Sequence, residues 1–253
     1  MTDKVDVVIC FYRNERLWPF VAWGLAQNQD HIGTVIISND EPWGNSSRVA
    51  IEIASREARL TVPLKFIDHP RQGMRQTQCF NDGVAAATAE DILQIDDDIV
   101  LAPNCISTFL AASGYKTLLT GRLHDIPRCN LTTSMLKDPP ILKVDKRLIA
   151  PHITDLWLHV RDSFLFYNRA DYLAIGGHDE SYQDGQEYGY GYVDYDFGLR
   201  WFKEFGQDSF EMTDAVAYHM SGLERGHQFS QANQARFKGK LQEYTGNMVV
   251  PLA

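Results

Sequence analysis

Residues 93–101 read Leu-Gln-Ile-Asp-Asp-Asp-Ile-Val-Leu, which places three adjacent carboxylates inside an otherwise apolar stretch. Burying unpaired charge among apolar residues is costly, so a cation or a polar ligand is expected beside these acids. Side chains alternate between the two faces of a strand, so Asp96 and Asp98 share one direction while Asp97 points away. The alternative interpretation is a solvated acidic turn that binds nothing.

Three strand-and-helix pairs precede the acids. Short apolar runs predict strands, and apolar residues at helical spacing predict helices. This alternation predicts right-handed βαβ units, and therefore an α/β fold with a mostly parallel, twisted, Rossmann-like sheet covered by helices on both faces. Ligands of such sheets bind at the carboxyl ends of the strands, where the acids lie. The expected strands are 5–11, 34–38, 64–67 and 91–95, and the expected helices are 14–28, 46–59 and 77–88.

The composition is that of an ordinary globular chain with enough apolar material for one core. A net charge of −9 argues against a nucleic acid partner, because phosphate backbones are usually held by clustered Lys and Arg. No run approaches the roughly 20 apolar residues of a membrane span, so no transmembrane segment is expected. The regular alternation fades after residue 123, but no linker or repeat marks a second domain. We therefore expect a single domain over residues 1–253.

The cysteines and the first residues of the chain indicate the cellular compartment in which we expect the protein. The four cysteines lack Cys-x-x-Cys spacing and mostly lie in apolar or helical stretches, which favours buried thiols and a reducing compartment. The chain opens into a strand pattern without the charged and apolar segments of a signal peptide. We expect a cytoplasmic protein, with peripheral attachment to a membrane left open.

A second cluster combines glycines, aromatic residues and acids. Residues 176–180 read Gly-Gly-His-Asp-Glu, and the glycines imply an unusual backbone path. Residues 194–202 follow with the character of a helix start, with acids in the first turn. Asp194 could be the base that deprotonates a hydroxyl if burial raises its pKa toward neutrality. The plainer interpretation is that Asp194 caps the helix.

Other polar residues come directly after the expected strands. Tyr12 and Asn14 follow the first strand and Asp40 follows the second, so Tyr12 could stack on a nucleobase and Asp40 could accept a hydrogen bond from its edge. Arg71 and Arg75 follow the third strand and could contact a diphosphate or a base. Helix capping, turn formation and a solvated loop are the alternative interpretations.

A histidine lies near the end of a later strand. Residues 215–220 read Ala-Val-Ala-Tyr-His-Met, and a neutral imidazole such as that of His219 is a normal ligand for Mn²⁺ alongside carboxylates. A lone histidine is more often structural, but its position after two acidic clusters favours a metal role. Mg²⁺ and Mn²⁺ also prefer oxygen ligands and bridge phosphate oxygens. Asp98 and His219 are therefore candidate metal ligands.

The order of these pieces resembles that of family-2-like glycosyltransferases of the GT-A fold, from residue 5 to about residue 220. The resemblance implies transfer of a sugar from a nucleotide-diphosphate sugar, UDP- or GDP-linked, to a hydroxyl of a glycan or glycoconjugate acceptor, with Mn²⁺ or Mg²⁺. It also implies a nucleotide-binding half, residues 1–100, and an acceptor-binding half, residues 101–253. The Asp-x-Asp motif of the family falls on Asp96 and Asp98, as ribose and metal contacts. Taken together, the residues after the strands and the resemblance give the candidate nucleotide-contacting residues Tyr12, Asn14, Asp40, Arg71, Arg75, Asp96 and Asp97.

The resemblance extends to the second acidic cluster. The family's Gly-Gly-Phe-Asp-Glu and Glu-Asp-x-Asp patterns resemble residues 176–180 and 193–196, which implies that Asp194 is the base of an inverting enzyme. Val193 stands in place of the preceding glutamate, so a retaining mechanism stays open. His219 resembles the histidine that completes the metal site in several such enzymes. The basic run 222–240 could fold over the diphosphate or form a solvated helix.

Three other functions fit parts of the sequence. Haloacid-dehalogenase-like phosphatases carry Asp-x-Asp after an apolar strand, but on their first strand. Nucleotidyltransferases that make nucleotide sugars usually have a glycine-rich basic loop after the first strand, which residues 12–15 lack. A non-catalytic carbohydrate-binding module explains the aromatic residues between 182 and 195 but not the paired acids. Metal-dependent binding of a nucleotide sugar separates the transferase from the last of these.

Overall fold

The first strand, β1 (Val5–Phe11), is buried on both of its faces. Val7 and Ile9 pack into one apolar cluster, and Val8 and Cys10 pack into another on the opposite face. A strand of this kind is typical of the centre of a sheet that helices cover on both sides. The computed structural model describes residues 4–12, 14–39, 45–69, 75–128, 130–144, 160–182, 191–221 and 231–245.

The first half of the chain alternates strands with helices as predicted. The remaining strands are β2 (Ile32–Asn39), β3 (Leu64–Asp68), β4 (Asp91–Asp96), β5 (Ile99–Leu101), β6 (Leu118–Pro127), β7 (Phe164–Asn168) and β8 (Phe210–Ser221). The α-helices are α1 (Trp18–Ala26), α2 (Asn45–Glu57), α3 (Gln76–Ala86), α4 (Cys105–Ala112), α5 (Arg169–Ala174), α6 (Val193–Phe205) and α7 (Gln231–Thr245). Short 3₁₀ helices span Gln29–His31, Thr133–Lys137 and Gln207–Ser209.

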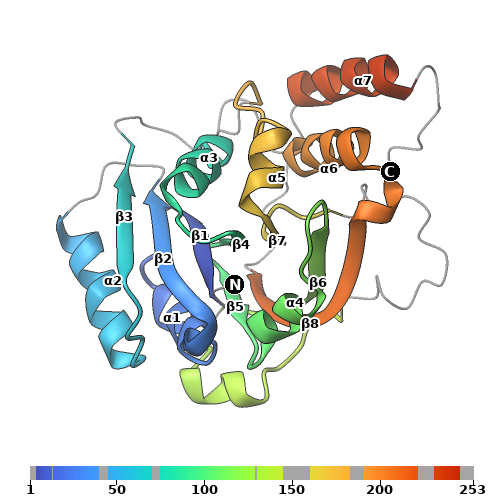
Figure 1. Ribbon diagram of the computed structural model, residues 1–253. Coiled ribbons are helices and arrows are strands. Elements are labelled where there is room, and N and C mark those ends of the chain that lie inside the picture. The colour runs from blue at the N-terminus through green and yellow to red at the C-terminus, as the bar shows by residue number, and fades with distance from the viewer. Residues whose placement is uncertain are drawn as a thin grey trace.

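The described strands form one sheet in the order β3-β2-β1-β4-β7-β6-β8-β5 (Figure 1). The strands β3, β2, β1 and β4 pair in parallel, as the βαβ alternation predicted. Strand β7 lies antiparallel between β4 and β6, and β5 pairs antiparallel with β8 at the edge. Strands β6 and β8 are parallel to each other. The sheet is therefore parallel in its first half and mixed in its second.

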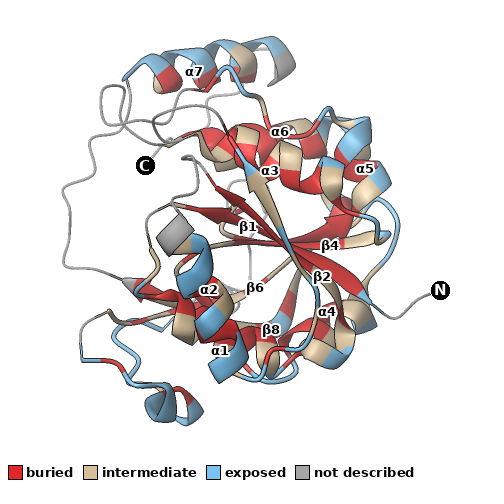
Figure 2. Ribbon diagram, turned by 90° about the vertical axis from the view of Figure 1, so that its left-hand side faces the viewer, coloured by how far each residue is buried: buried red, intermediate tan, exposed pale blue. Residues whose placement is uncertain are grey.

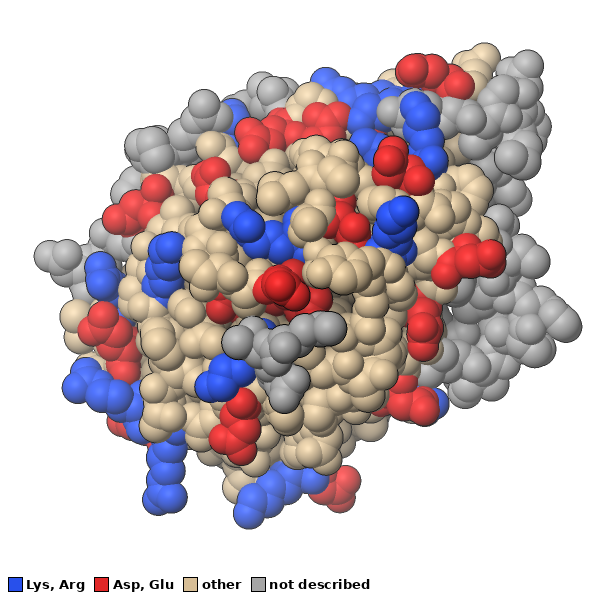
Figure 3. All heavy atoms as spheres, viewed as in Figure 1, with Lys and Arg blue, Asp and Glu red and all other residues tan. Residues whose placement is uncertain are grey.

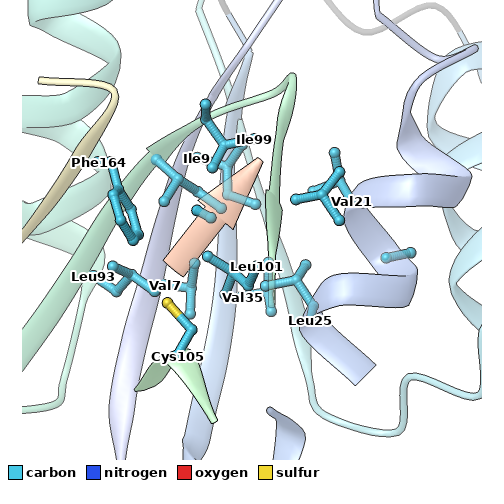
Figure 4. Close-up of a cluster of buried hydrophobic side chains, with 14 of the residues drawn as sticks. Val7, Ile9, Val21, Leu25, Val35, Leu93, Ile99, Leu101, Cys105 and Phe164 are labelled. Atoms are coloured by element: carbon cyan, nitrogen blue, oxygen red, sulfur yellow. The ribbon is translucent and has the colours of Figure 1, made fainter. Parts of the chain in front are cut away.

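Helices cover both faces of this sheet (Figure 2). Helices α1, α2 and α4 pack on one face, and Figure 4 shows Val21 and Leu25 of α1 in the same cluster as Val7 and Ile9. Helices α3, α5 and α6 pack on the other face, and α7 adds Phe237 to that second cluster. Burying one such aliphatic or aromatic side chain stabilises the fold by about 1.5–3 kcal/mol. The two clusters hold the strand ends in fixed positions.

A close approach of α1 to β5 fixes the short strand that follows the acids. A Cβ atom added to Gly24 would lie 2.7 Å from the backbone nitrogen of Leu101 and 2.9 Å from its oxygen. Asn28 strengthens the same junction, because its side chain donates to the carbonyl of Ala102 at 3.0 Å and accepts from the N–H of Ile106 at 3.1 Å. Helix α1 thereby sets the position of β5.

Two features of the described residues concern the surroundings of the protein: the length of their apolar helices and the distribution of their charged side chains. Among the described residues, no helix is long and apolar enough to cross a membrane. On the face seen in Figure 3, the acidic and basic side chains of the described residues are interspersed. Fields from such mixed exposed charges are largely screened beyond about 10 Å at moderate salt.

Candidate functional site

The three acids lie at the carboxyl end of β4, where the chain turns toward β5. Asp96 is the last residue of β4 and faces α3, whose first residue, Gln76, donates its amide N–H to Asp96 Oδ1 at 2.9 Å. Asp96 is partly buried, and burial together with the neighbouring charge of Asp98 raises its pKa to about 7.

Asp97 follows β4 in the turn to β5, and its hydrogen-bond partners differ from those of Asp96. Its Oδ2 accepts from the backbone N–H of Tyr12 and its Oδ1 accepts from the side-chain N–H of Asn14, both at 2.6 Å. Burial raises the pKa of Asp97 well above its ordinary value. Arg128, just beyond β6, donates to Asn14 Oδ1 at 2.7 Å. Asp97 therefore anchors the loop after β1, and a direct nucleotide contact for it stays a prediction.

The structure brings Asp98 and His219 together from distant parts of the chain. Strand β5 pairs with β8 so that Ile99 lies opposite His219, and the backbone N–H of Met220 donates to the carbonyl of Asp98 at 3.0 Å. His219 Nε2 then lies 3.6 Å from Asp98 Oδ2. Its Nδ1 lies 2.9 Å from Oδ1 of Asp125 in β6. The two carboxylates outweigh the effect of burial and raise the pKa of His219 to about 9.

Asp194 lies in the first turn of α6 and next to this group. Helix α6 begins after Tyr192, which has a φ of 71° and makes no side-chain cap bond, so Asp194 is not the N-cap residue. Its carboxylate accepts from the backbone N–H of Tyr195 at 2.9 Å, which satisfies one free donor of the first turn. Burial raises the pKa of Asp194 to about 6, and its charge interacts with that of Asp96. Asp194 has the acidity that a general base needs at neutral pH.

The nearby Asp196 has a structural role instead. It is 1% exposed and accepts from Arg200 Nε at 2.7 Å, from Lys240 Nζ at 2.7 Å and from the Tyr182 hydroxyl at 3.2 Å. A buried carboxylate with three donors is fully used by the fold. The contacts tie α6 to α7, so the described part of the basic run, which contains Lys240, packs against α6 in this structure.

The glycine pair before these acids takes the unusual path that the sequence predicted. Gly176 has a φ of 80° and Gly177 a φ of 68°. The next residue, His178, is buried and stacks on Phe197 with ring centroids 4.5 Å apart. Burial lowers the pKa of His178 well below its ordinary value. His178 Nε2 lies 3.2 Å from Gln94 Oε1, so this segment is a core element.

Of the remaining candidates near the strand ends, three lie among the described residues and two do not. Tyr12 and Asn14 are partly buried beside Asp97. Arg75 precedes α3 and is partly buried, one residue before the glutamine that contacts Asp96. Asp40 and Arg71 lie outside the described residues.

Comparison of this sequence with protein-family models and with curated proteins finds no relative. Solved structures do match. TarS 1-349 of S. aureus aligns with 98% of this chain and 66% of its own at a TM-score of 0.61 and 12% identity. GalNAc-T7, solved with UDP, GalNAc and Mn²⁺, aligns with 93% of this chain and 47% of its own at a TM-score of 0.64 and 11% identity.

A further crystal structure of S. aureus TarS aligns with 99% of this chain and 46% of its own at a TM-score of 0.59 and 14% identity. TarS and GalNAc-T7 are glycosyltransferases of the GT-A fold. The chain has the GT-A fold. It spans about half to two thirds of the length of these structures, and identities of 11–14% carry the fold alone.

The separation of the Asp98 carboxylate and the His219 imidazole allows both to contact one divalent cation. Among the described residues, no group of three or more His, Cys, Asp or Glu side chains is arranged to hold a metal. Mg²⁺ is usually bound through one or two carboxylates plus substrate phosphates and water, so a large protein cage is not required. Two ligands about 2.1 Å from one ion lie at most about 4.2 Å apart. The 3.6 Å between Asp98 Oδ2 and His219 Nε2 is within that reach.

Three residues beside the site were missed by the sequence analysis. Gln76, Asp125 and Arg128 contact Asp96, His219 and Asn14 respectively. Asp125 and Arg128 belong to β6 and its end, where buried and partly buried residues mix without the strict alternation that marks a strand. No local pattern identifies these residues, because their partners lie far away in the chain.

Proposed function

We propose that this chain is a metal-dependent glycosyltransferase that moves a sugar from a nucleotide-diphosphate sugar, UDP- or GDP-linked, to a hydroxyl of a glycan or glycoconjugate. One observation carries the proposal: Asp98 and His219 meet at the carboxyl end of β4 in a GT-A fold, 3.6 Å apart. The GalNAc-T7 structure with UDP, GalNAc and Mn²⁺ supports the choice of ligands. We further propose a cytoplasmic location, with peripheral membrane attachment left open.

The donor nucleotide would occupy the ends of β1, β2 and β4. Asp96 has one oxygen bonded to Gln76 and would accept a ribose hydroxyl with the other. Tyr12, held by Asp97, would lie beside the base, and Arg75 would contact the diphosphate or the base. Asp98 and His219 would hold Mn²⁺ or Mg²⁺, which neutralises the leaving diphosphate.

Asp194 would act as the base at this site. The acceptor oxygen forms a bond to the anomeric carbon of the sugar while the bond from that carbon to the diphosphate oxygen breaks. The electron pair of the broken bond stays with the diphosphate, and the acceptor proton goes to Asp194. With a pKa of about 6, Asp194 is mostly ionised at pH 7 and can take that proton. This mechanism inverts the anomeric configuration.

The donor site is tested by calorimetric binding of UDP, GDP, TDP and CMP sugars to the wild type and to Asp98→Ala. Each titration is run with Mn²⁺, with Mg²⁺ and with EDTA. We expect one nucleotide class to bind only with a divalent cation, and the substitution to weaken that binding at least tenfold because one metal ligand is lost. Binding that is the same in EDTA contradicts the metal role, and no binding of any donor contradicts the proposed function.

A further inference from the structure

The pairing of three strands places His219 between two carboxylates. In β8, His219 lies opposite Asp125 of β6 on one side and opposite Ile99 of β5 on the other. Directly paired residues on neighbouring strands point to the same face of a sheet. The side chain of Asp125 therefore lies beside the imidazole. Asp98 lies in the turn just before β5, and its Oδ2 is 3.6 Å from His219 Nε2.

The two ring nitrogens of His219 have different partners. Nδ1 is 2.9 Å from Asp125 Oδ1, which is a hydrogen-bond distance, whereas Nε2 is 3.6 Å from Asp98 Oδ2, which is not. A carboxylate accepts hydrogen bonds, so Nδ1 is the nitrogen that donates its proton to Asp125. In the neutral ring, Nε2 then carries the lone pair, and it is directed toward Asp98.

The backbone of Asp125 is held by hydrogen bonds to a later segment of the chain. Its N–H donates to the carbonyl of Lys143 at 3.0 Å, and its carbonyl accepts from the N–H of Leu142 at 2.7 Å. These bonds add to the pairing of β6 with β8. Asp125 Oδ1 thus lies at hydrogen-bond distance from Nδ1, on a strand whose backbone is bonded to its neighbours, while Asp98 faces the other ring nitrogen.

We propose that Asp125 is the positioning residue of His219: it sets the tautomer and the orientation of the imidazole so that Nε2 can bind a divalent cation together with Asp98. This inference rests on the proposed function, since it assigns a partner to one of its metal ligands. Histidines that bind metals generally donate their second ring N–H to a carboxylate or carbonyl, and loss of that partner typically weakens metal binding tenfold to a hundredfold. Sequence spacing gave no sign of this residue, which lies 94 positions before its partner.

The test measures Mn²⁺ affinity through the electron paramagnetic resonance signal of the free ion, with Mn²⁺ alone and with Mn²⁺ plus UDP. We expect Asp125→Asn to weaken Mn²⁺ binding tenfold to a hundredfold, because the amide no longer fixes the proton on Nδ1. Asp214→Asn is the matched control. Asp214 lies in the same strand as His219, its side chain is 83% exposed and it pairs only with Arg122 among the described ion pairs. We expect this control to bind Mn²⁺ as the wild type does.

A double-mutant cycle separates positioning from a general structural effect. If Asp125 acts through His219, adding Asp125→Asn to His219→Ala causes no further loss of Mn²⁺ affinity. A further loss in that background overturns the inference, and so does wild-type affinity in the single variant. A wild-type protein that binds no Mn²⁺, alone or with UDP, instead contradicts the metal role in the proposed function. Melting temperatures of all variants exclude unfolding as the cause of a loss.

Discussion

Asp96, Asp97 and Asp98 are adjacent in the chain but have three different surroundings. One carboxylate oxygen of Asp96 accepts a hydrogen bond from Gln76, and burial raises the pKa of Asp96 to about 7. Asp97 uses both oxygens on the loop after β1. Asp98 faces His219 across 3.6 Å. The turn after β4 gives the middle acid different partners from its neighbours, so one short acidic run supplies both an anchor for the fold and a candidate ligand site.

At the residue scale, the first prediction concerns Asp194. We expect Asp194→Asn to lower kcat by about 10²–10⁴-fold, since this is the range that general base catalysis contributes. In the wild type, kcat/KM should fall as the pH drops below about 6, because protonation of Asp194 removes the base. Sugar transfer measured from pH 5 to pH 9 gives both results.

A distant carboxylate at the other end of the helix is the control for this measurement. Asp208 is exposed in the 3₁₀ helix after α6, so Asp208→Asn should keep wild-type kcat and the wild-type pH profile. If Asp194→Asn transfers sugar at the full wild-type rate, Asp194 is not the base. A retaining mechanism, which the valine at position 193 left open, then becomes the better description.

At the element scale, the first half of the sheet could be predicted from the sequence, whereas in the second half the strand at 215–220, within β8, was indicated but β5 and β6 were not. The expected strands 5–11, 34–38, 64–67 and 91–95 lie within β1 to β4. Strands β1, β2 and β4 lie inside the sheet and are mostly buried, and such strands of a parallel sheet are continuous apolar runs. Strand β3 lies at the edge and is less buried. Strand β6 contains glycine, arginine, histidine and aspartate, and it lacks such a run. Its partners are strands much later in the chain, which local periodicity does not report.

The candidate site also has residues that the sequence predicted and residues that it did not. Asp96 and Asp98 were found because the chain supplies three charges in an apolar segment, and His219 was found because a histidine follows a short apolar strand. The proximity of Asp98 and His219 was expected only from the resemblance. Asp125 could not be found, since its contact with His219 depends on the register between β6 and β8.

The second prediction concerns the junction between α1 and β5. We expect Gly24→Ala to destabilise the protein by about 1–3 kcal/mol, because the added methyl group would lie 2.7 Å from the backbone of Leu101 and overpack this contact. Strand β5 carries the residue after Asp98, so the same change should also weaken Mn²⁺ binding. Denaturant unfolding measures the first effect and Mn²⁺ titration the second.

Gly239 in α7 provides the matched substitution. A Cβ atom there meets no atom of the described residues within 4 Å. Gly239→Ala should therefore stabilise the protein by up to about 1 kcal/mol through the higher helix propensity of alanine, without a change in Mn²⁺ affinity. Equal stability changes for the two substitutions would show that the approach of α1 to β5 is not tight.

At the scale of the whole molecule, stability depends on pH through groups at the acidic turn. His219 has its pKa raised from 6.5 to about 9 in the folded protein. The folded state therefore binds this proton more tightly than the unfolded state does, and the stabilisation is complete below pH 6.5 and lost as the pH rises through 9. Asp96 and Asp194 have raised pKa values too, and their contributions disappear at lower pH, by about 7 and 6 respectively.

The third prediction concerns the stability that His219 contributes between pH 6 and pH 9, a range above the pKa values of Asp96 and Asp194 for the most part. In EDTA, the melting temperature of the wild type should exceed that of His219→Gln most at pH 6, and the gap should shrink as the pH rises to 9. Comparing the two proteins at each pH removes the contributions of groups that both contain. A gap that is constant from pH 6 to pH 9 would mean that His219 does not gain its proton from the two carboxylates beside it.

The position of β8 in the sheet also bears on synthesis of the protein. Strand β5 has its sheet partner only in β8, the last of the described strands in the chain. A nascent chain that has left the ribosome only as far as β7 contains all three acids but neither the strand that holds β5 nor His219. The acidic turn therefore acquires its histidine only after residue 219 has been translated, and shorter chains carry the acids without His219.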